Sequence, residues 1–190
     1  MKMPVSLEST RILLRPWKDD DYAPFASMNL DPEVMRFQGG PMSRAASDAM
    51  ADYFRSDLEG RGWGFWAIEH AREGRFMGYT GILNTADLPA PLPIPPCVEI
   101  GWRLDREFWG HGYVTEAAVR ALDFAFAELG APEVFAYVTP ENMRSRAVAE
   151  RLGMSLTPTV FEHPFFPEGH AYREHLLYSI SHGGRQAEQG

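Results

Sequence analysis

The chain has 190 residues, a length that suits one domain whose core is stable without disulfides or metals. Its composition, 45% hydrophobic and 23% charged, is that of an ordinary globular protein. The formal net charge of −8 repels phosphate backbones, which argues against a nucleic-acid partner and favours cationic ligands. The one cysteine, Cys97, excludes an internal disulfide, and no spacing of residues suggests a metal site.

The beginning of the chain, MKMPVSLESTRILLRPW, lacks the apolar core of a secretion signal. No later segment has the uninterrupted apolar length of a membrane span. We therefore expect a cytoplasmic protein without membrane association. In it, residues 1–182 form one domain and residues 183–190 form a flexible tail.

The first half of the chain predicts a strand, then helices, then a hairpin. Residues 11–17, RILLRPW, predict a strand, and residues 19–37 predict one or two short helices broken near Asp31-Pro32. Ser43 is expected to cap a helix that Gly60 ends. GFWAIEH and RFMGYTGIL, joined through AREG, predict two strands of a hairpin.

The second half begins with TADLPAPLPIPP, whose five prolines exclude a helix and a central strand and predict a stiff loop. Residues 97–104 predict a strand, and apolar residues at helical spacing predict a helix over residues 113–129. A strand over EVFAYVT and a helix over residues 142–152 are expected next. Two terminal strands are expected in PTVFEH and HLLYSIS.

A glycine turn joins the strand over residues 97–104 to the helix that begins at residue 113. Gly110 and Gly112 leave the first backbone N–H groups of this helix uncovered, and the positive end of the helix dipole favours an anion there. A glycine pair alone is equally consistent with a plain turn. Position 115 is Thr, so the third glycine of a dinucleotide-binding oxidoreductase is missing.

Two longer motifs, VEIGWRLDREFWGHGYVTEA and VTPENMRSRAVAERLGM, resemble the GNAT N-acetyltransferases, most closely their RimJ/RimL-type branch. The resemblance implies an α/β fold with a central mixed sheet flanked by helices. The fourth and fifth expected strands, residues 97–104 and EVFAYVT, would splay apart around acetyl-CoA.

The same resemblance implies which residues bind the cofactor. The diphosphate would rest on the backbone of residues 110–115, and pantetheine would pair with the main chain of Arg103 and Leu104. Arg106 is a further candidate, although Glu107 holds the place where the wider family has Gln or Arg. The residues of the diphosphate turn are Gly110, His111, Gly112, Tyr113, Val114 and Thr115.

Acetyl transfer needs a base for the amine and an acid for the leaving thiolate. The resemblance makes Glu99 the general base; its structural alternative is an exposed, ion-paired strand residue. Asn142 is expected to cap a helix, and the resemblance adds a contact with pantetheine. Ser145, three residues later, would protonate the thiolate. Cys97 is interpreted as a buried strand residue rather than a nucleophile.

Several ring side chains have both a structural and a functional interpretation. His163 and His175 are each explained by a bond to a nearby backbone group, with a role as base as the alternative. His175 and Tyr178 form an H-x-x-Y pattern that some related chains share. The remaining rings are interpreted as core, or else as a wall of the acceptor pocket: Trp63, Trp66, Trp102, Phe165 and Phe166.

The sequence therefore predicts an enzyme that moves acetyl from acetyl-CoA directly to a primary amine in a ternary complex, releasing CoA. The acceptor is a protein N-terminus or a small-molecule amine. The alternative is a module that binds CoA or acyl-CoA without turnover. Exposed strands near the C-terminus are compatible with a homodimer.

Overall fold

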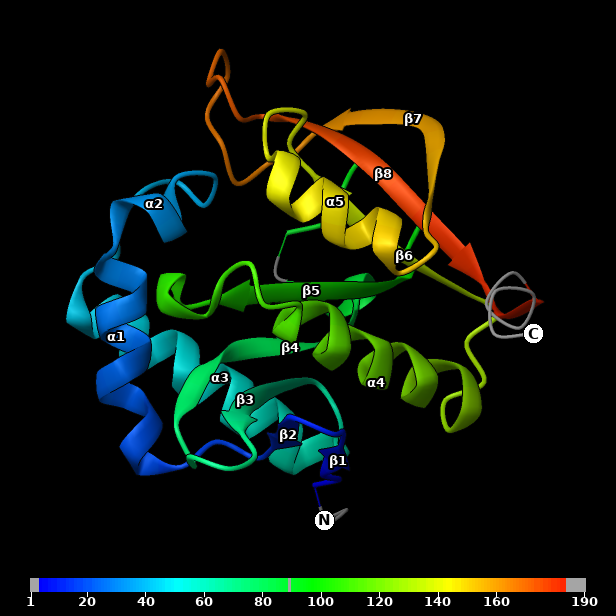
Figure 1. Ribbon diagram of the computed structural model, residues 1–190. Helices are drawn as coiled ribbons and strands as arrows, with labels where there is room; N and C mark the ends of the chain where they lie inside the picture. The colour runs from blue at the N-terminus through cyan, green and yellow to red at the C-terminus, as the bar shows by residue number, and fades with distance from the viewer. Residues whose placement is uncertain (1–3, 89, 184–190) are drawn as a thin grey trace. The chain divides into compact units, whose positions relative to one another are not determined.

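The computed structural model describes residues 4–88 and 90–183 and divides into two compact units (Figure 1). The first unit holds the described residues up to Ile82 together with Gly101–Ala121. The second unit holds Leu83–Ile100 and the described residues from Leu122 onward. The strand order is β1-β2-β3-β4-β5-β6-β8-β7, which confirms the expected mixed sheet flanked by helices.

Antiparallel pairing builds the sheet of the first unit. β1 (Leu7–Glu8) pairs with β2 (Ile12–Arg15), β2 with β3 (Phe65–His70), and β3 with β4 (Phe76–Asn84). β5 (Val98–Leu104), like β4, has residues in both units. β4 is buried over most of its length, as expected for a strand covered on both faces. The predicted hairpin is therefore confirmed.

Glycine allows β4 to lie close to β5. Gly78 has a φ of 143°, and a Cβ atom there would lie 2.2 Å from the carbonyl oxygen of Arg103. The backbone of β4 also bonds to β5 beside this point, since Asp105 N donates to Met77 O at 2.8 Å. A larger residue at position 78 would push β5 away, so this glycine fixes the position of Arg103.

Three helices of the first unit follow β2: α1 (Tyr22–Leu30), α2 (Pro32–Met35) and α3 (Arg44–Arg61). The side chain of Ser43 accepts from Ala46 N, which confirms the predicted cap. The expected end at Gly60 is wrong. The helix continues to Arg61, and Gly62 ends it, because it takes the left-handed conformation with a φ of 86°.

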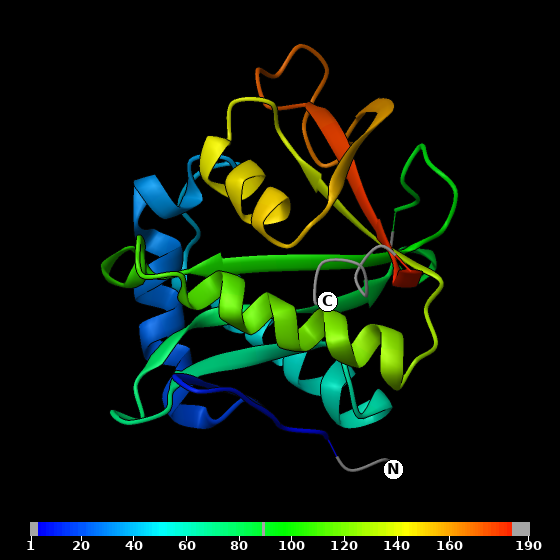
Figure 2. The same ribbon diagram turned by 45° about the vertical axis from the view of Figure 1, so that its right-hand side comes forward.

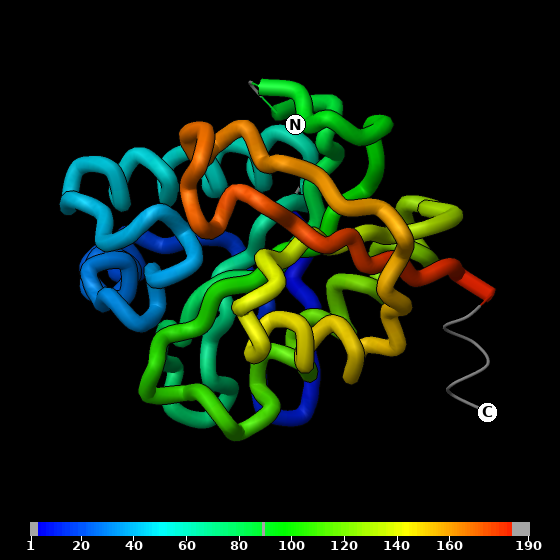
Figure 3. Tube along the Cα trace, turned by 90° about the horizontal axis from the view of Figure 1, so that it is seen from above, coloured from blue at the N-terminus to red at the C-terminus, as the bar shows by residue number. Residues whose placement is uncertain are grey.

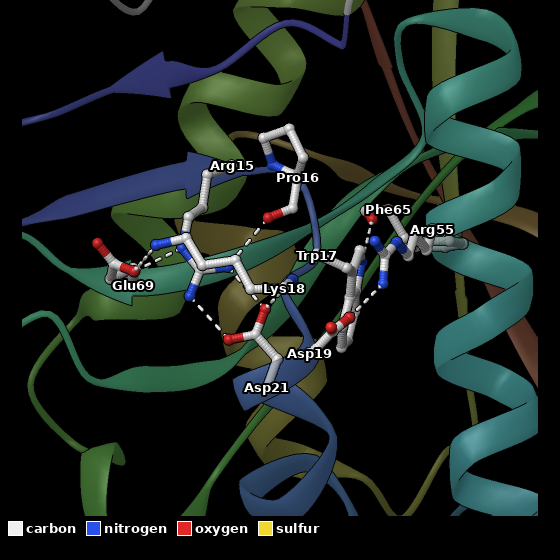
Figure 4. Close-up of polar contacts among 9 residues, drawn as sticks. All are labelled: Arg15, Pro16, Trp17, Lys18, Asp19, Asp21, Arg55, Phe65 and Glu69. Carbon is white, nitrogen blue, oxygen red and sulfur yellow. Dashed lines mark hydrogen bonds and ion pairs between the residues drawn. The ribbon is translucent and has the colours of Figure 1, made fainter.

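Aromatic side chains fill the core between these helices and the first unit's sheet. Phe54 on α3 lies with its ring centroid 4.8 Å from Phe65 and 4.9 Å from Tyr79. Trp17 Nε1 donates to the carbonyl oxygen of Phe65 at 2.8 Å (Figure 4). Trp66 is fully buried, which confirms its interpretation as core. These contacts hold α3 against β3 and β4.

The second unit is built on β6 (Glu133–Val138), β7 (Ser155–Glu162) and β8 (Glu174–Ser181). β6 pairs in parallel with β5 at Phe135 and Glu99, and antiparallel with β8. β7 and β8 form an antiparallel hairpin, seen from two directions in Figure 2 and Figure 3. All three strands were predicted. The expected splay between β5 and β6 stays a prediction.

The second unit's sheet has two different faces because side chains alternate along each strand. Tyr178 on β8 pairs with Ala136 on β6, and helix α5 (Met143–Arg151) covers this face, since Arg146 Nε donates to the Tyr178 hydroxyl at 3.1 Å. The opposite face carries Tyr137. Its buried core lies against the proline-rich loop and consists of Leu92, Phe161 and Leu177, with Leu88, Ile94, Phe135 and Tyr137 packed around them.

Helix α4 (Tyr113–Ala127) follows the glycine turn and ends two residues before its expected end. In the part of the chain that the structure describes, no helix is long and apolar enough to cross a bilayer. One domain over residues 1–182 stays a prediction. The expected tail, residues 183–190, lies outside the described residues except for Gly183.

Candidate functional site

The glycine turn has a backbone that other residues adopt only with strain. Gly110 has a φ of 79° and Gly112 a φ of 77°. A Cβ atom at Gly110 would meet no atom within 4 Å, so the space beside this backbone is open. This conformation alone is enough to require glycine at both positions, which is what the plain-turn alternative states. The open space beside Gly110 also leaves room for a ligand to reach the amides.

The amides of this turn have no hydrogen-bond acceptors in the part of the chain that the structure describes. Glu116 N makes the first bond of α4, to Gly112 O at 3.0 Å, and Trp109 N bonds to Arg106 O. Between them, the N–H groups of residues 110–115 find no acceptor among residues 4–88 and 90–183. A cluster of such donors at the positive end of a helix attracts an anion.

Contacts from β5 and from Arg11, directly before β2, hold the turn in place. Trp109 Nε1 donates to the carbonyl oxygen of Leu104 at 2.8 Å. Arg11 Nη1 donates to the carbonyl oxygen of His111 at 3.0 Å, and its guanidinium lies 4.7 Å from the centre of the Tyr113 ring. Sequence reasoning missed Arg11 as part of this site. The turn is therefore fixed before any ligand binds.

The charged side chains beside the turn are engaged with other residues. Arg106 forms an ion pair with Asp31 at 3.1 Å, and Glu107 forms one with Arg75. The Glu107–Arg75 pair is exposed to solvent, whereas the Asp31 side chain is half-buried. Arg106 could bind the cofactor only after leaving Asp31. Glu107, which departs from the family pattern, is paired with Arg75.

Glu99 lies buried in the second unit with only 8% of its surface exposed. Tyr137 donates a hydrogen bond to its carboxylate, and its Oε2 atom is buried without a partner among the described residues. Burial raises the pKa of Glu99 to about 7, and the bond from Tyr137 opposes this rise. The alternative of an exposed, ion-paired carboxylate is wrong. A carboxylate of this kind exchanges protons near neutral pH.

A group of rings shares the face of Glu99. The rings of His163 and His175 lie 4.9 Å apart, and Tyr137 lies 5.2 Å from His163 and 5.7 Å from His175. Burial lowers the pKa of both imidazoles, for His163 to about 4, and the neighbouring His175 adds to this lowering. Both rings are therefore neutral at pH 7, and a cationic imidazole is excluded here.

Backbone groups set the protonation of these two imidazoles. His163 Nδ1 accepts from Phe165 N at 3.1 Å, so its proton lies on Nε2. His175 Nδ1 lies 3.0 Å from Arg173 O and must donate to it, which leaves Nε2 as an acceptor. The interpretation of both residues as partners of backbone groups is confirmed. Tyr178 lies on the opposite face of the sheet, so the two residues of the H-x-x-Y pattern, His175 and Tyr178, do not share one site.

Asn142 and Ser145 form the cap of α5. The Asn142 Oδ1 atom accepts from Ser145 N at 3.2 Å, which confirms the predicted cap. The amide nitrogen of Asn142 and the hydroxyl of Ser145 bond to none of the described residues. Because α5 covers the face of Tyr178, Glu99 and Ser145 lie on opposite faces of the second unit's sheet.

The remaining predicted side chains are divided between core and surface. Phe166 is buried, whereas Phe165 is 68% exposed, and Trp63 and Trp102 are half-buried. Cys97 is half-buried rather than buried, directly before β5, and burial raises the pKa of its thiol. Among the described residues, no group of three His, Cys, Asp or Glu side chains is arranged to hold a metal.

Comparison with known proteins gives consistent matches. Residues 11–155 match the family model of the acetyltransferase (GNAT) domain. The Bacillus subtilis protein YkkB is 32% identical, over 84% of this chain and 91% of its own. The Aspergillus fumigatus FsC-acetyl coenzyme A-N(2)-transacetylase is 27% identical, over 95% of this chain and 78% of its own.

A solved structure shares the fold. It is RimJ from Mycobacterium smegmatis in complex with CoA-disulfide, and it superposes with a TM-score of 0.72. The two sequences are 23% identical, and the match covers 95% of this chain and 88% of RimJ. This similarity extends over the expected mixed sheet and its helices.

Proposed function

Because the chain belongs to the acetyltransferase (GNAT) family, we propose that it is an N-acetyltransferase that moves acetyl from acetyl-CoA directly to a primary amine. The observation that carries the proposal is the set of backbone N–H groups at residues 110–115 that lack acceptors among the described residues. Acetyl-CoA would supply the acetyl group as a thioester and leave as CoA.

The glycine turn fits the diphosphate of CoA by its chemistry. Several unbonded amides at the positive end of a helix match a group with two negative charges. The space beside Gly110 allows an anion to approach the backbone closely. We assign the diphosphate to the backbone of residues 110–115, and pantetheine to the main chain of Arg103 and Leu104. Phosphate contact by the Arg106 side chain is secondary, since Asp31 already holds it.

Glu99 is the group we assign as general base. Its pKa of about 7 suits it to take a proton from the ammonium form of an acceptor, so that the neutral amine attacks. The unbonded Oε2 atom is free to accept that proton, while Tyr137 holds the other oxygen. His163 and His175 are neutral and bonded to backbone groups, so they add no competing charge on this face.

Two residues at the start of α5 complete the assignment. The Asn142 side chain keeps its oxygen in the helix cap and has its N–H₂ group left to donate to a pantetheine carbonyl. The unbonded Ser145 hydroxyl would give a proton to the departing thiolate. Because Glu99 and Ser145 lie on opposite faces of the second unit's sheet, this assignment requires the thioester to lie between β5 and β6, where the resemblance implies that the strands splay apart.

The acceptor class follows from the family and from one relative. The name of the Aspergillus fumigatus relative specifies an acetyl coenzyme A-dependent N-transacetylase, which supports an amine acceptor here. We include both peptide N-termini and small-molecule amines. Cytoplasmic location and a homodimer remain proposals; for the second, β7 is the last strand of the sheet and exposes Leu156 and Val160.

Release of free CoA tests the proposal. Purified protein is mixed with acetyl-CoA and a panel of amines and N-terminal peptides, and the new thiol is measured. We expect amine-dependent release, and a loss of about 10²- to 10⁴-fold in kcat/KM in Glu99→Gln, as for removal of a general base. Binding of acetyl-CoA without release by any amine would instead support the module without turnover.

A further inference from the structure

The two buried arginines of the described first unit differ in their surroundings. Arg15 is 5% exposed and Arg103 is 7% exposed. Arg15 contacts two carboxylates: both oxygens of Asp21, at 2.6 and 2.8 Å, and Glu69 at 2.5 Å (Figure 4). No described carboxylate forms an ion pair with Arg103. In the described part of the chain, the buried charge of Arg103 therefore has no opposite charge beside it.

Among the described residues, the recorded partners of the Arg103 guanidinium are all neutral. Its Nη1 atom donates to Asn29 Oδ1 at 2.7 Å, and its Nη2 atom donates to Gln38 Oε1 at 3.1 Å. The Tyr79 ring centre lies 5.3 Å from its Cζ atom. Amides and a π face reduce the cost of burying a cation but do not neutralise it. An anion that reaches this site would pair with a buried cation that no described carboxylate neutralises.

One edge of the guanidinium is fixed and the other is incompletely bonded. Asn29 is fully buried, and its amide nitrogen donates to Ser47 Oγ at 2.9 Å, which fixes the oxygen that faces Arg103 Nη1. Arg103 Nε is buried and has no hydrogen-bond partner among the described residues. The N–H bonds on Nε and Nη2 are parallel, and this edge is one that carboxylates bind with both oxygens.

The partner on the incomplete edge is a replaceable side chain. Gln38 is exposed and lies in the loop between α2 and α3. It is followed by Gly39 and Gly40, with φ values of 87° and 95°. If this exposed side chain turns into solvent, it breaks one hydrogen bond, the one from Arg103 Nη2. Departure of Gln38 would free the Nη2 donor, which lies beside the unbonded Nε donor of the same edge.

We propose that the Nε–Nη2 edge of Arg103 binds a carboxylate of the acceptor in place of Gln38, so that the enzyme acetylates amines that also carry a carboxylate. This inference rests on the proposed function, because the diphosphate is already assigned to residues 110–115 and the acceptor is the remaining reactant. The carboxylate is that of a free amino acid or of an acidic residue near a peptide N-terminus.

Matched acceptors test the inference. Free amino acids are compared with their C-terminal amides, which keep the amine and lose the negative charge. Peptides with Asp or Glu in the first two positions are compared with the same peptides carrying Asn or Gln. We expect kcat/KM to be about tenfold or more higher for the carboxylate in one of the two sets, the value of one charge-assisted hydrogen bond. The set that shows the preference identifies the source.

Two variants and one control assign the preference to Arg103. Gln38→Glu places a carboxylate beside the edge from within the chain, and Arg103→Met removes the cation. In both, the ratio of kcat/KM for carboxylate over amide should fall to about one. Arg44→Met removes an exposed cation that pairs with Asp48, and should keep the ratio of the wild type. Equal kcat/KM for carboxylate and amide in the wild type would overturn the inference, as would a preference that survives in Gln38→Glu and Arg103→Met.

Binding is measured separately, so that the failure of the inference is distinguished from the failure of the proposed function. The wild type and Gln38→Glu are titrated calorimetrically with the same amino acids, peptides and neutral analogues, without acetyl-CoA. Carboxylates should bind the wild type about tenfold or more tightly than their neutral analogues, and the difference should vanish in Gln38→Glu. This result without CoA release by any amine would support the anion site at Arg103 and contradict the proposed acetyltransferase activity. Release of CoA with no difference in binding would do the reverse.

Discussion

Arg11, directly before β2, holds Glu116 in the first turn of α4, although 105 residues separate them in the chain. The Arg11 backbone N–H donates to Glu116 Oε1 at 2.9 Å, and Arg11 Nε donates to Oε2 at 2.7 Å. Ser9 adds a third bond to the same carboxylate, at 2.7 Å. Burial alone would raise the pKa of Glu116, but these bonds from Ser9 and Arg11 lower it. The carboxylate therefore stays ionised and neutralised beside the glycine turn.

Loss of this anchor should weaken binding of CoA. Arg11→Met removes the bond to the His111 carbonyl and leaves the Glu116 charge uncompensated beside the amides that face the diphosphate. We expect the Kd for CoA, measured by calorimetry, to rise about tenfold, since one or two charge-assisted bonds are lost. Arg44→Met, which removes an exposed cation paired with Asp48, is the matched control and should bind CoA as the wild type does. Equal Kd values for Arg11→Met and this control would show that the anchor has no part in binding.

The two buried arginines should respond differently to the same substitution. Arg15→Met leaves Asp21 and Glu69 without their buried partner, which typically costs about 3–5 kcal/mol. Arg103→Met leaves only neutral groups behind and should cost about 1 kcal/mol. Urea unfolding measures both free energies. A cost for Arg103→Met as large as that for Arg15→Met would show that an unseen charge already compensates Arg103.

The rate of acetyl transfer should depend on the ionisation of Glu99. Burial raises its pKa to about 7, so its basic form increases as pH rises through that value. We expect kcat/KM to rise through about pH 7 in the wild type and this step to disappear in Glu99→Gln. Tertiary-amine buffers, which cannot be acetylated, are used at constant ionic strength so that only the pH changes along the series. The same step in both proteins would assign it to the acceptor amine rather than to Glu99.

The free energy of unfolding should also depend on the ionisation of Glu99, and it should fall as pH rises. The folded-state pKa of Glu99 is raised, so its contribution is fully present below its ordinary value of 4.5 and is lost as pH rises through about 7. Between pH 5 and 8, the free energy of unfolding of the wild type should fall relative to Glu99→Gln by about 3 kcal/mol at most. His163 acts in the opposite direction, because its pKa is lowered to about 4, and it cancels in the difference since both proteins contain it. A difference independent of pH would contradict a buried Glu99.

The sequence predicted the elements whose signals are local. The glycine turn, the caps at Ser43 and Asn142, and the period of helix α4 all depend on residues within one or two turns of each other. Gly60 was mistaken for a helix end because glycine is costly but tolerated inside a helix. The true end at Gly62 depends on the left-handed conformation that it adopts.

The electrostatic features of the site could not be predicted, because they depend on distant contacts. Asn29 and Gln38 lie 74 and 65 residues from Arg103 in the chain, and no local pattern joins them. The raised pKa of Glu99 results from burial on a face that β6 and the loops complete. Tyr137 lies two residues after Phe135 on β6 and shares its face, which the sequence could predict, whereas the bond from Tyr137 to Glu99 could not be predicted.

Calorimetric titration with CoA and with pantetheine, which lacks the diphosphate and the 3′-phosphoadenosine, tests the central claim most directly, with adenosine 3′-phosphate titrated as the control for the nucleoside part. If the amides of residues 110–115 hold the diphosphate, CoA should bind about 100-fold or more tightly than pantetheine, which corresponds to nearly 3 kcal/mol. Equal affinities for the two compounds, or no binding of CoA at millimolar concentration, would contradict the assignment of this turn and the acetyltransferase mechanism built on it.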